Sequence, residues 1–94
     1  MPTVKRAGIF SKPSAPAAET LVPKLIEWLR ARGIEVRFDH ATALYLGGED
    51  ARRGGVRRED VPDGCDMMIV LGGDGTLLSA ARAMVGMDIP LFAV

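Results

Sequence analysis

Apolar positions gather in four short runs along the chain, separated by longer polar or mixed stretches. The four runs cover residues 4–10, 34–38, 66–71 and 91–94. Each is short enough to form a strand, and flanking glycines, prolines and charges mark its ends. Between the first two runs, apolar side chains recur at helical spacing. A strand, a helix and a second strand in this order are typical of a right-handed crossover between parallel strands.

The helix before the second run is the clearest element of the pattern. Its apolar stripe consists of Leu21, Leu25, Ile26, Trp28 and Leu29. Trp28 is expected to anchor the core, and Gly33 stands where a left-handed C-terminal cap belongs. The start stays open. Pro23 suits a first turn, which favours Thr20 as the N-cap, whereas a start near residues 14–16 would leave Pro23 inside the helix.

The third apolar run leads into a turn that contains three glycines and one carboxylate. Its residues are Gly72, Gly73, Asp74, Gly75 and Thr76. A helix is expected over residues 76–85, with Thr76 as a possible cap and four side chains facing the sheet, namely Leu77, Ala80, Ala81 and Met84. Glycines leave the backbone open to a ligand, and helix N-termini favour anions. The pattern therefore predicts a phosphate site at the carboxyl edge of a sheet.

Asp74 is the unexpected residue in this turn, because a carboxylate repels phosphate. Its presence is explained if it accepts the proton of an attacking hydroxyl, or if a metal ion lies between it and the phosphate. Both explanations belong to phosphoryl transfer to an alcohol. The turn has neither the Gly-Lys-Ser/Thr of a Walker A loop nor the Gly-x-Gly-x-x-Gly of a dinucleotide fingerprint. The alternative is an Asp-Gly turn whose carboxylate only bonds its own backbone.

Residues 39–65 have the weakest pattern in the chain. Two glycine pairs, at 47–48 and 54–55, break any long element, and four arginines alternate with four acidic residues. A helical turn or two could form at residues 41–46, and otherwise we expect a mobile surface loop of mixed charge, with phosphate binding by its arginines as the alternative. His40 is expected to be an ordinary surface residue, and Cys65 a small apolar residue before the third strand.

Composition narrows the possible functions. Twelve basic and twelve acidic residues cancel in the 94-residue chain, so no overall field favours nucleic acid or an acidic membrane as a partner. The single cysteine excludes an internal disulfide, which fits a reducing compartment. No apolar run approaches membrane-spanning length. We therefore expect a cytoplasmic protein with one α/β domain, built on a parallel sheet of about four strands.

Residues 71–82 (LGGDGTLLSAAR) and 89–94 (IPLFAV) resemble the N-terminal domain of NAD kinase. The first strand, closing on Lys12-Pro13, and the Gly-Ile-Glu-Val after the helix extend this resemblance over nearly the whole chain. The Gly-Gly-Asp-Gly core alone is less specific. Diacylglycerol kinases and sphingosine kinases share it, and phosphofructokinases have a close form of it. The resemblance implies a three-layer α/β/α, Rossmann-like N-terminal domain over residues 1–94. It also implies a fragment truncated near Val94, without the second, β-rich domain.

The same resemblance implies an activity. NAD kinase transfers the terminal phosphoryl group of ATP or polyphosphate to the 2′-hydroxyl of the adenosine ribose of NAD, giving NADP. By motif position, Asp74 would take the hydroxyl proton and, with Gly75, contact NAD. Gly72, Gly73 and Thr76 would shape the phosphate-facing turn. Mg²⁺ would accompany ATP, held mainly by phosphates and not by protein ligands. The complete enzyme would be a homo-oligomer, and this fragment alone would be inactive.

Three residues near the motif leave questions open. Many family members carry a basic residue that contacts the cofactor five places after the motif Asp, and here that residue is Ser79. Arg82 follows one turn later, but helical geometry turns it toward a neighbouring face. Lys12 would lie at the same sheet edge as the glycine turn, either as a solvated loop lysine or as a cation that helps to hold phosphate.

Two other functions remain as alternatives. A lipid kinase of the same superfamily would follow Gly-Gly-Asp-Gly-Thr with a Glu-Val/Ile and Asn-Gly pattern, whereas this chain continues Leu-Leu-Ser-Ala-Ala-Arg. A non-catalytic nucleotide-binding module would keep the fold without turnover. Salt-sensitive NAD binding without NADP formation would favour that second alternative.

Overall fold

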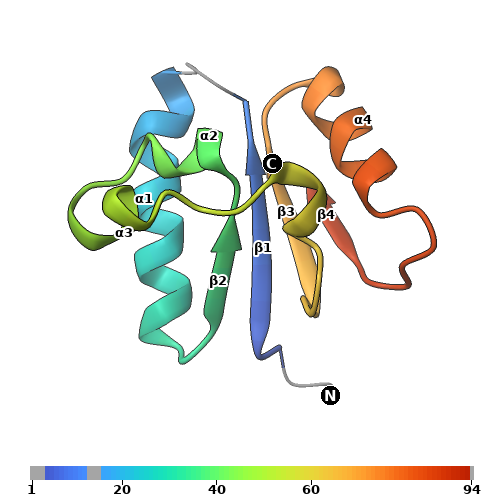
Figure 1. Cartoon of the computed structure of the whole chain (residues 1–94), viewed down its shortest axis with the longest axis horizontal. Coiled ribbons are helices and arrows are strands. Elements are labelled where there is room, and N and C mark those ends of the chain that lie inside the picture. Colours follow the sequence, from blue (N-terminus) through green and yellow to red (C-terminus); the bar gives the residue numbers. More distant parts are fainter. Residues whose placement is uncertain (1–3, 13–15, 94) are drawn as a thin grey trace.

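Four parallel strands form a single sheet in the computed structural model (Figure 1). The structure describes residues 4–12 and 16–93, and of Pro16, Ala17 and Asp74 it describes the backbone alone. The strand order is β2–β1–β3–β4. The strands are β1 (Arg6–Ser11), β2 (Glu35–Phe38), β3 (Met67–Leu71) and β4 (Leu91–Ala93). The predicted parallel sheet of four strands is confirmed. The expected turn at Pro13 and the last residue, Val94, lie outside the described residues.

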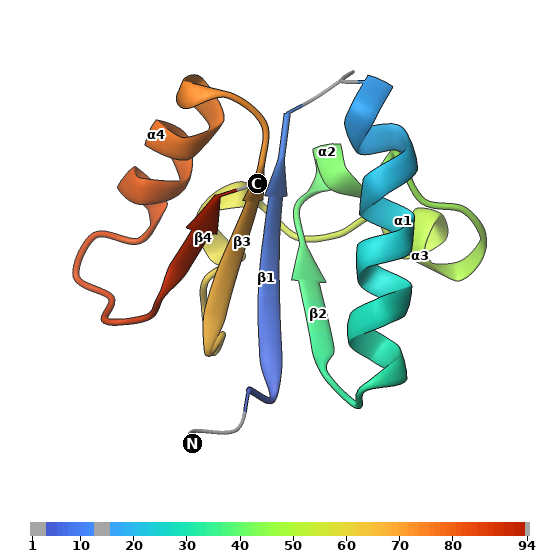
Figure 2. The same ribbon diagram turned by 180° about the vertical axis from the view of Figure 1, so that it is seen from behind.

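Helices cover both faces of this sheet, which makes the domain a three-layer α/β/α unit. The helices are α1 (Pro16–Ala31), α2 (His40–Ala43), α3 (Gly48–Arg53) and α4 (Asp74–Ala83), with a 3₁₀ turn η1 (Arg58–Asp60). Figure 1 shows η1 in front of the sheet and α1 behind it, and Figure 2 shows α1 from the other side. Two separate clusters of buried side chains, one on each face, form the core.

The two central strands supply both clusters by strict alternation. Ile9 and Ile69 pack with α1 on one face, while Phe10, Met68 and Val70 pack with α4 and the segment around η1 on the other. Successive side chains of a strand point to opposite faces, so a strand covered on both sides needs apolar residues at every position. This explains the unbroken apolar run that ends at the glycine turn.

Helix α1 buries a different stripe from the one that the sequence predicts. Ala18, Val22, Ile26 and Leu29 are buried, whereas Leu21 is exposed and the Trp28 ring is 51% exposed. The expectation that Trp28 anchors the core is wrong. Trp28 lies about 100° around the helix from Leu29, outside the buried stripe. Its ring instead stacks under the Arg32 guanidinium, whose central carbon lies 3.6 Å from the ring centroid.

The start of α1 also differs from the interpretation that Thr20 caps it. The helix begins at Pro16 and carries Pro23 in its interior. Ala18 and Val22, one turn apart, are both buried against the sheet. Packing of the first turns offsets the backbone hydrogen bond that Pro23 cannot donate. The predicted end is confirmed, because Gly33 has a left-handed φ of +76° just beyond the helix.

Residues 39–65 are not an unstructured loop, which corrects the expectation for this stretch. They contain α2, α3 and η1. The Arg37 guanidinium donates to the carbonyl oxygens of Asp60 (2.7 Å) and Val61 (3.2 Å), and the Val56 amide donates to the Phe38 carbonyl (2.9 Å). Arg30 of α1 makes two 2.8 Å bonds to the Asp50 carboxylate. The stretch is therefore bonded to β2 and to α1.

Candidate active site

The loops after β1 and β3 lie side by side at the carboxyl edge of the sheet. Ser11 and Leu71, the last residues of the two strands, are in register. From β1 the chain passes through α1 outward to β2, and from β3 it passes through α4 outward to β4 on the other side. Between β1 and β3 the direction of winding therefore reverses. Open α/β sheets bind their ligands at such a switch point.

The glycine turn occupies this point and needs a glycine at its first position. Gly72 has a φ of +148°, and a Cβ atom there would come within 2.8 Å of Thr76 Oγ1 and 3.1 Å of Lys12 Cβ. A Cβ on Gly73 or Gly75 would meet no atom within 4 Å. The outer side of the turn is thus open for a ligand, while its inner side is packed against Thr76 and Lys12.

Helix α4 begins at Asp74, two residues earlier than expected. Gly73 is its N-cap and makes no side-chain cap hydrogen bond. Thr76 is therefore not the cap. Its amide donates to the Gly73 carbonyl (3.1 Å), and its side chain is buried beneath Gly72. Asp74 starts the helix at the open edge of the sheet, and its side chain lies outside the described atoms. The five predicted site residues thus form one continuous turn.

The side of α4 that faces the sheet is narrower than predicted. Ala80 and Met84 are buried and Leu77 is partly buried against the same cluster, as expected. Ala81 is exposed, so its predicted contact with the sheet is wrong. It follows Ala80 by about 100° around the helix, which turns it away from the buried face.

Arg58 is the residue of this edge that the sequence pattern did not indicate. Its Nε donates to Asp39 Oδ2 (3.0 Å), Nη1 to Ser79 Oγ (3.1 Å) and Nη2 to the Ser11 carbonyl oxygen (3.2 Å). One guanidinium thus joins the end of β1, the start of α2 and the second turn of α4. Residues 57–60 read Arg-Arg-Glu-Asp, and nothing in this charge pattern distinguishes Arg58 from Arg57.

Asp39 extends this network into the protein. Its carboxylate is 4% exposed, and Oδ1 accepts from the Thr42 amide (2.8 Å) as the N-cap of α2. The Thr42 hydroxyl bonds the Ser11 hydroxyl (2.7 Å), and both side chains are buried. The buried polar groups at the ends of β1 and β2 are thus mutually satisfied.

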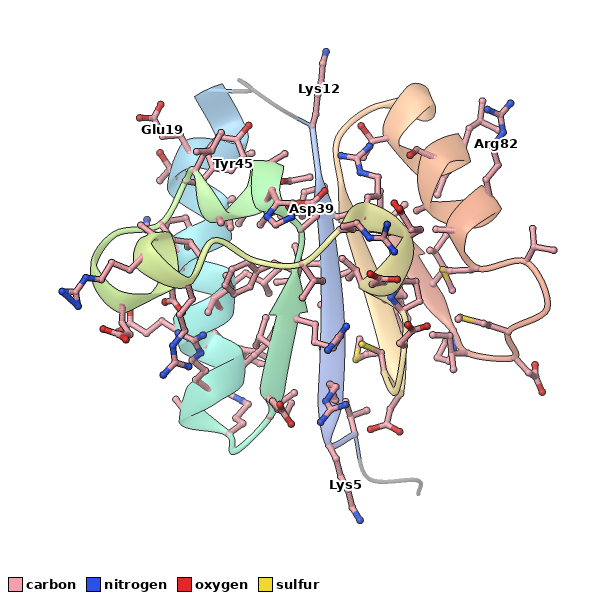
Figure 3. All side chains as sticks on the ribbon, in the orientation of Figure 1. Lys5, Lys12, Glu19, Asp39, Tyr45 and Arg82 are labelled. Atoms are coloured by element: carbon pink, nitrogen blue, oxygen red, sulfur yellow. The ribbon has the colours of Figure 1, made fainter. Side chains whose placement is uncertain are left out.

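Ser79 and Arg82 lie on the side of α4 that faces η1. Together with Arg58, Glu59 and Ala83 they line an open pocket of about 300 Å³. The Ser79 hydroxyl accepts from Arg58, so a guanidinium from the 39–65 stretch lies next to this position. Arg82 is exposed and its side chain extends away from the sheet (Figure 3). Arg82 therefore does not replace the basic residue that many family members carry where this chain has Ser79.

Lys12 lies at the glycine turn, as the sequence predicts. Its amide donates to the Leu71 carbonyl (3.0 Å), and its own carbonyl accepts from the Tyr45 hydroxyl. Among the described side chains, which do not include that of Asp74, no three from His, Cys, Asp or Glu come together as a metal site. Within residues 4–12 and 16–93, no helix has the length and apolar character needed to cross a membrane.

Comparison with known proteins identifies the family. Residues 7–94 match the family described as the ATP-NAD kinase N-terminal domain. The chain is 62% identical, over its whole length, to an NAD kinase of Solibacter usitatus, of which it covers 31%. It is 45% identical over 97% of its length to an NAD kinase of Koribacter versatilis, and 42% identical over 97% to one of Geobacter metallireducens.

These alignments also set the extent of the match. The chain spans about 31% of the length of the Solibacter and Koribacter relatives, and 30% of the Geobacter one. The matched family region begins in β1 and includes the glycine turn, α4 and β4. Since that region covers almost the whole chain, the chain belongs to the NAD kinase family and corresponds to its N-terminal domain.

Proposed function

We propose that the complete protein is an NAD kinase, which transfers the terminal phosphoryl group of ATP or polyphosphate to the 2′-hydroxyl of the adenosine ribose of NAD. The observation that supports this most directly is the placement of Gly72–Thr76 at the switch point, with Asp74 as the first residue of α4. Its open outer side leaves room for a phosphate chain against the backbone. The product is NADP.

In this proposal Asp74 is the proton acceptor. A ribose hydroxyl is a weak nucleophile, and a carboxylate that takes its proton helps the oxygen attack the terminal phosphorus. The new O–P bond forms as the bond to the leaving phosphate breaks, so ATP leaves as ADP and the proton ends on Asp74. Asp74 and Gly75 also contact NAD. Gly72, Gly73 and Thr76 hold the turn in the shape that admits the phosphates.

A magnesium ion belongs to the proposed reaction, because it neutralises the charge that phosphoryl transfer concentrates on the phosphate oxygens. The described residues offer no cluster of acidic or imidazole ligands. We therefore propose that the ion arrives on the phosphates of ATP and is held mainly by them. The Gly72–Thr76 turn then has to orient phosphate oxygens and to exclude competing water from the ribose hydroxyl.

Two features of the whole enzyme are part of the same proposal. The complete protein works in the cytoplasm, which suits the buried, unpaired thiol of Cys65, the one cysteine of the 94-residue chain. It is also a homo-oligomer, as the family resemblance implies. We propose that the domain alone is inactive, because the family resemblance implies that a second domain supplies much of the NAD pocket.

The test uses the complete protein and a matched variant. Wild-type protein is incubated with NAD, ATP and Mg²⁺, and NADP is followed with an NADP-dependent dehydrogenase; diacylglycerol is the acceptor in a parallel reaction. Asp74→Asn keeps the size of the side chain but removes its basicity, so NADP formation should fall at least about a hundredfold. Its melting temperature should stay close to that of the wild type.

Other outcomes assign the protein differently. Wild-type turnover in Asp74→Asn would remove Asp74 from the proton-accepting role. Phosphate transfer to the lipid, with no NADP formed, would identify a lipid kinase. NAD binding without transfer to either acceptor would identify a nucleotide-binding module.

A further inference from the structure

The side chain of Lys12 extends from the sheet edge at which the glycine turn lies. We propose that its ammonium group binds a phosphate of the nucleotide on the Gly72–Thr76 turn; this inference rests on the proposed function. Two sources offer the same chemistry, namely the pyrophosphate of the dinucleotide and the phosphate chain of the donor.

Lys12 is in direct contact with the turn. Its amide donates to the carbonyl oxygen of Leu71, the residue before Gly72, at 3.0 Å. Its Cβ atom lies 3.1 Å from the position that a Cβ on Gly72 would take. The Lys12 side chain therefore begins at the surface of the turn. The flexible four-carbon stem of a lysine can bring the ammonium to a phosphate that rests there.

The pairing of the basic side chains at this edge favours Lys12 over Arg58 and Arg82 as the phosphate ligand. Arg58 is neutralised by the buried Asp39 carboxylate at 3.0 Å. The Arg82 side chain extends away from the sheet (Figure 3). Lys12 is exposed, and among the described side chains, which do not include that of Asp74, it has no ion-pair partner. An unpaired ammonium can bind a phosphate without first breaking an existing ion pair, and lysines commonly bind phosphate as point charges.

The main chain of Lys12 is held from two sides. The Leu71 carbonyl bonds its amide, and the Tyr45 hydroxyl donates to its carbonyl oxygen. Figure 3 shows the side chain extending beyond the end of β1, whereas Lys5 extends from the opposite end of the same strand. Two hydrogen bonds thus hold the Lys12 backbone at the turn, and the exposed side chain extends outward from it. This arrangement is suited to following a substrate phosphate.

The experiment compares three variants of the complete enzyme, with KM for NAD and for ATP measured separately. Lys12→Met removes the charge and keeps the stem; Lys12→Arg keeps the charge. Lys5→Met makes the same charge change at the opposite end of β1. Losing a charge-assisted contact should raise one KM about tenfold in Lys12→Met while kcat changes little. Lys12→Arg should restore most of the affinity, and Lys5→Met should match the wild type.

The two KM values distinguish the two phosphate sources. A rise for NAD alone assigns Lys12 to the pyrophosphate of the dinucleotide, and a rise for ATP alone assigns it to the donor. Both KM values within twofold of the wild type would overturn the proposal. An equal rise in Lys5→Met would also overturn it, because the effect would then follow net charge and not position.

Calorimetric titration with NAD and with tripolyphosphate separates this inference from the proposed function. If the wild-type protein forms no NADP, the proposed function fails, whatever Lys12 does. Binding of either probe that is weakened about tenfold in Lys12→Met alone would still support the phosphate contact. Unchanged binding of both probes would overturn it.

Discussion

Arg58 Nε lies 3.0 Å from the Oδ2 atom of Asp39, a residue that is 19 positions earlier in the chain. The carboxylate is almost fully buried, whereas the guanidinium is about one-third exposed. The same guanidinium bonds the Ser11 carbonyl and the Ser79 hydroxyl. Through these bonds Arg58 holds the 39–65 stretch against the end of β1 and against α4, the helix that begins in the glycine turn.

Replacing Arg58 with alanine should destabilise the complete protein. The change leaves the buried Asp39 carboxylate with only the Thr42 amide as partner. Breaking a fully buried ion pair costs about 3–5 kcal/mol, and the partial exposure of Arg58 reduces this to about 2 kcal/mol. The melting temperature should fall by several degrees. The proposed NAD kinase activity should fall too, because α4 loses its bond to the sheet edge through Ser79.

Arg57→Ala is the matched control for this prediction. The Arg57 side chain is exposed and pairs only with Glu59 and Asp60 in its own short segment. Such surface pairs contribute little, so its free energy of unfolding should change by about 0.5 kcal/mol or less. An equal loss of unfolding free energy in the two variants would show that the Arg58–Asp39 pair stabilises the protein no more than a surface ion pair does.

Gly72→Ala should impair catalysis with little effect on the rest of the fold. Alanine disfavours a φ of +148°, and its Cβ would come within 2.8 Å of Thr76 Oγ1. Thr76 is buried in α4, so the turn itself has to shift. Strain of this kind costs about 1–3 kcal/mol. A turn displaced from the ribose hydroxyl should lower kcat at least about tenfold, measured by NADP formation.

Gly73→Ala is the control for strain at Gly72, and it is compared through the melting temperature because Gly73 itself faces the proposed phosphates. Gly73 has a φ of −88°, and an added Cβ would meet nothing within 4 Å. The backbone of the turn should therefore tolerate this change, and the melting temperature should equal that of the wild type. If both variants keep full turnover, the turn does not need to hold its shape for catalysis.

The features that the sequence predicted correctly are those set by neighbours along the chain. The apolar run before Gly72 had to be a doubly covered strand, and the glycines had to turn at its end. Both follow from local patterns, as does the left-handed Gly33 after α1.

The features that the sequence missed depend on contacts between distant residues. Arg58 looks like its neighbour Arg57 in the sequence, and only the buried carboxylate of Asp39 distinguishes them. Trp28 belongs by spacing to the apolar stripe of α1. The rotation of α1 over the sheet nevertheless leaves its ring beside Arg32 and exposed. Spacing places a residue on a helix face, but the width of the contact with the sheet decides whether it is buried.

Cys65 should make the protein less stable in alkali. Its side chain is buried and its thiol donates to the Val61 carbonyl (3.1 Å). Burial raises the pKa of the Cys65 thiol from 9.0 to about 11. Above pH 9 the unfolded chain loses this proton first and binds fewer protons than the folded protein. The free energy of unfolding should therefore fall as the pH rises from about 9 to 11.

The measurement is urea unfolding of the complete protein at pH 8, 9 and 10, with Cys65→Ala as the control. Lysines and tyrosines titrate in both proteins, so the difference between the two curves isolates the thiol. The wild type should lose roughly 1 kcal/mol more than the variant between pH 9 and pH 10. In the folded protein at pH 8, the thiol should also react slowly with a disulfide reagent. Parallel pH profiles for the two proteins, or rapid labelling of the folded wild type that is absent in Cys65→Ala, would contradict a buried, protonated Cys65.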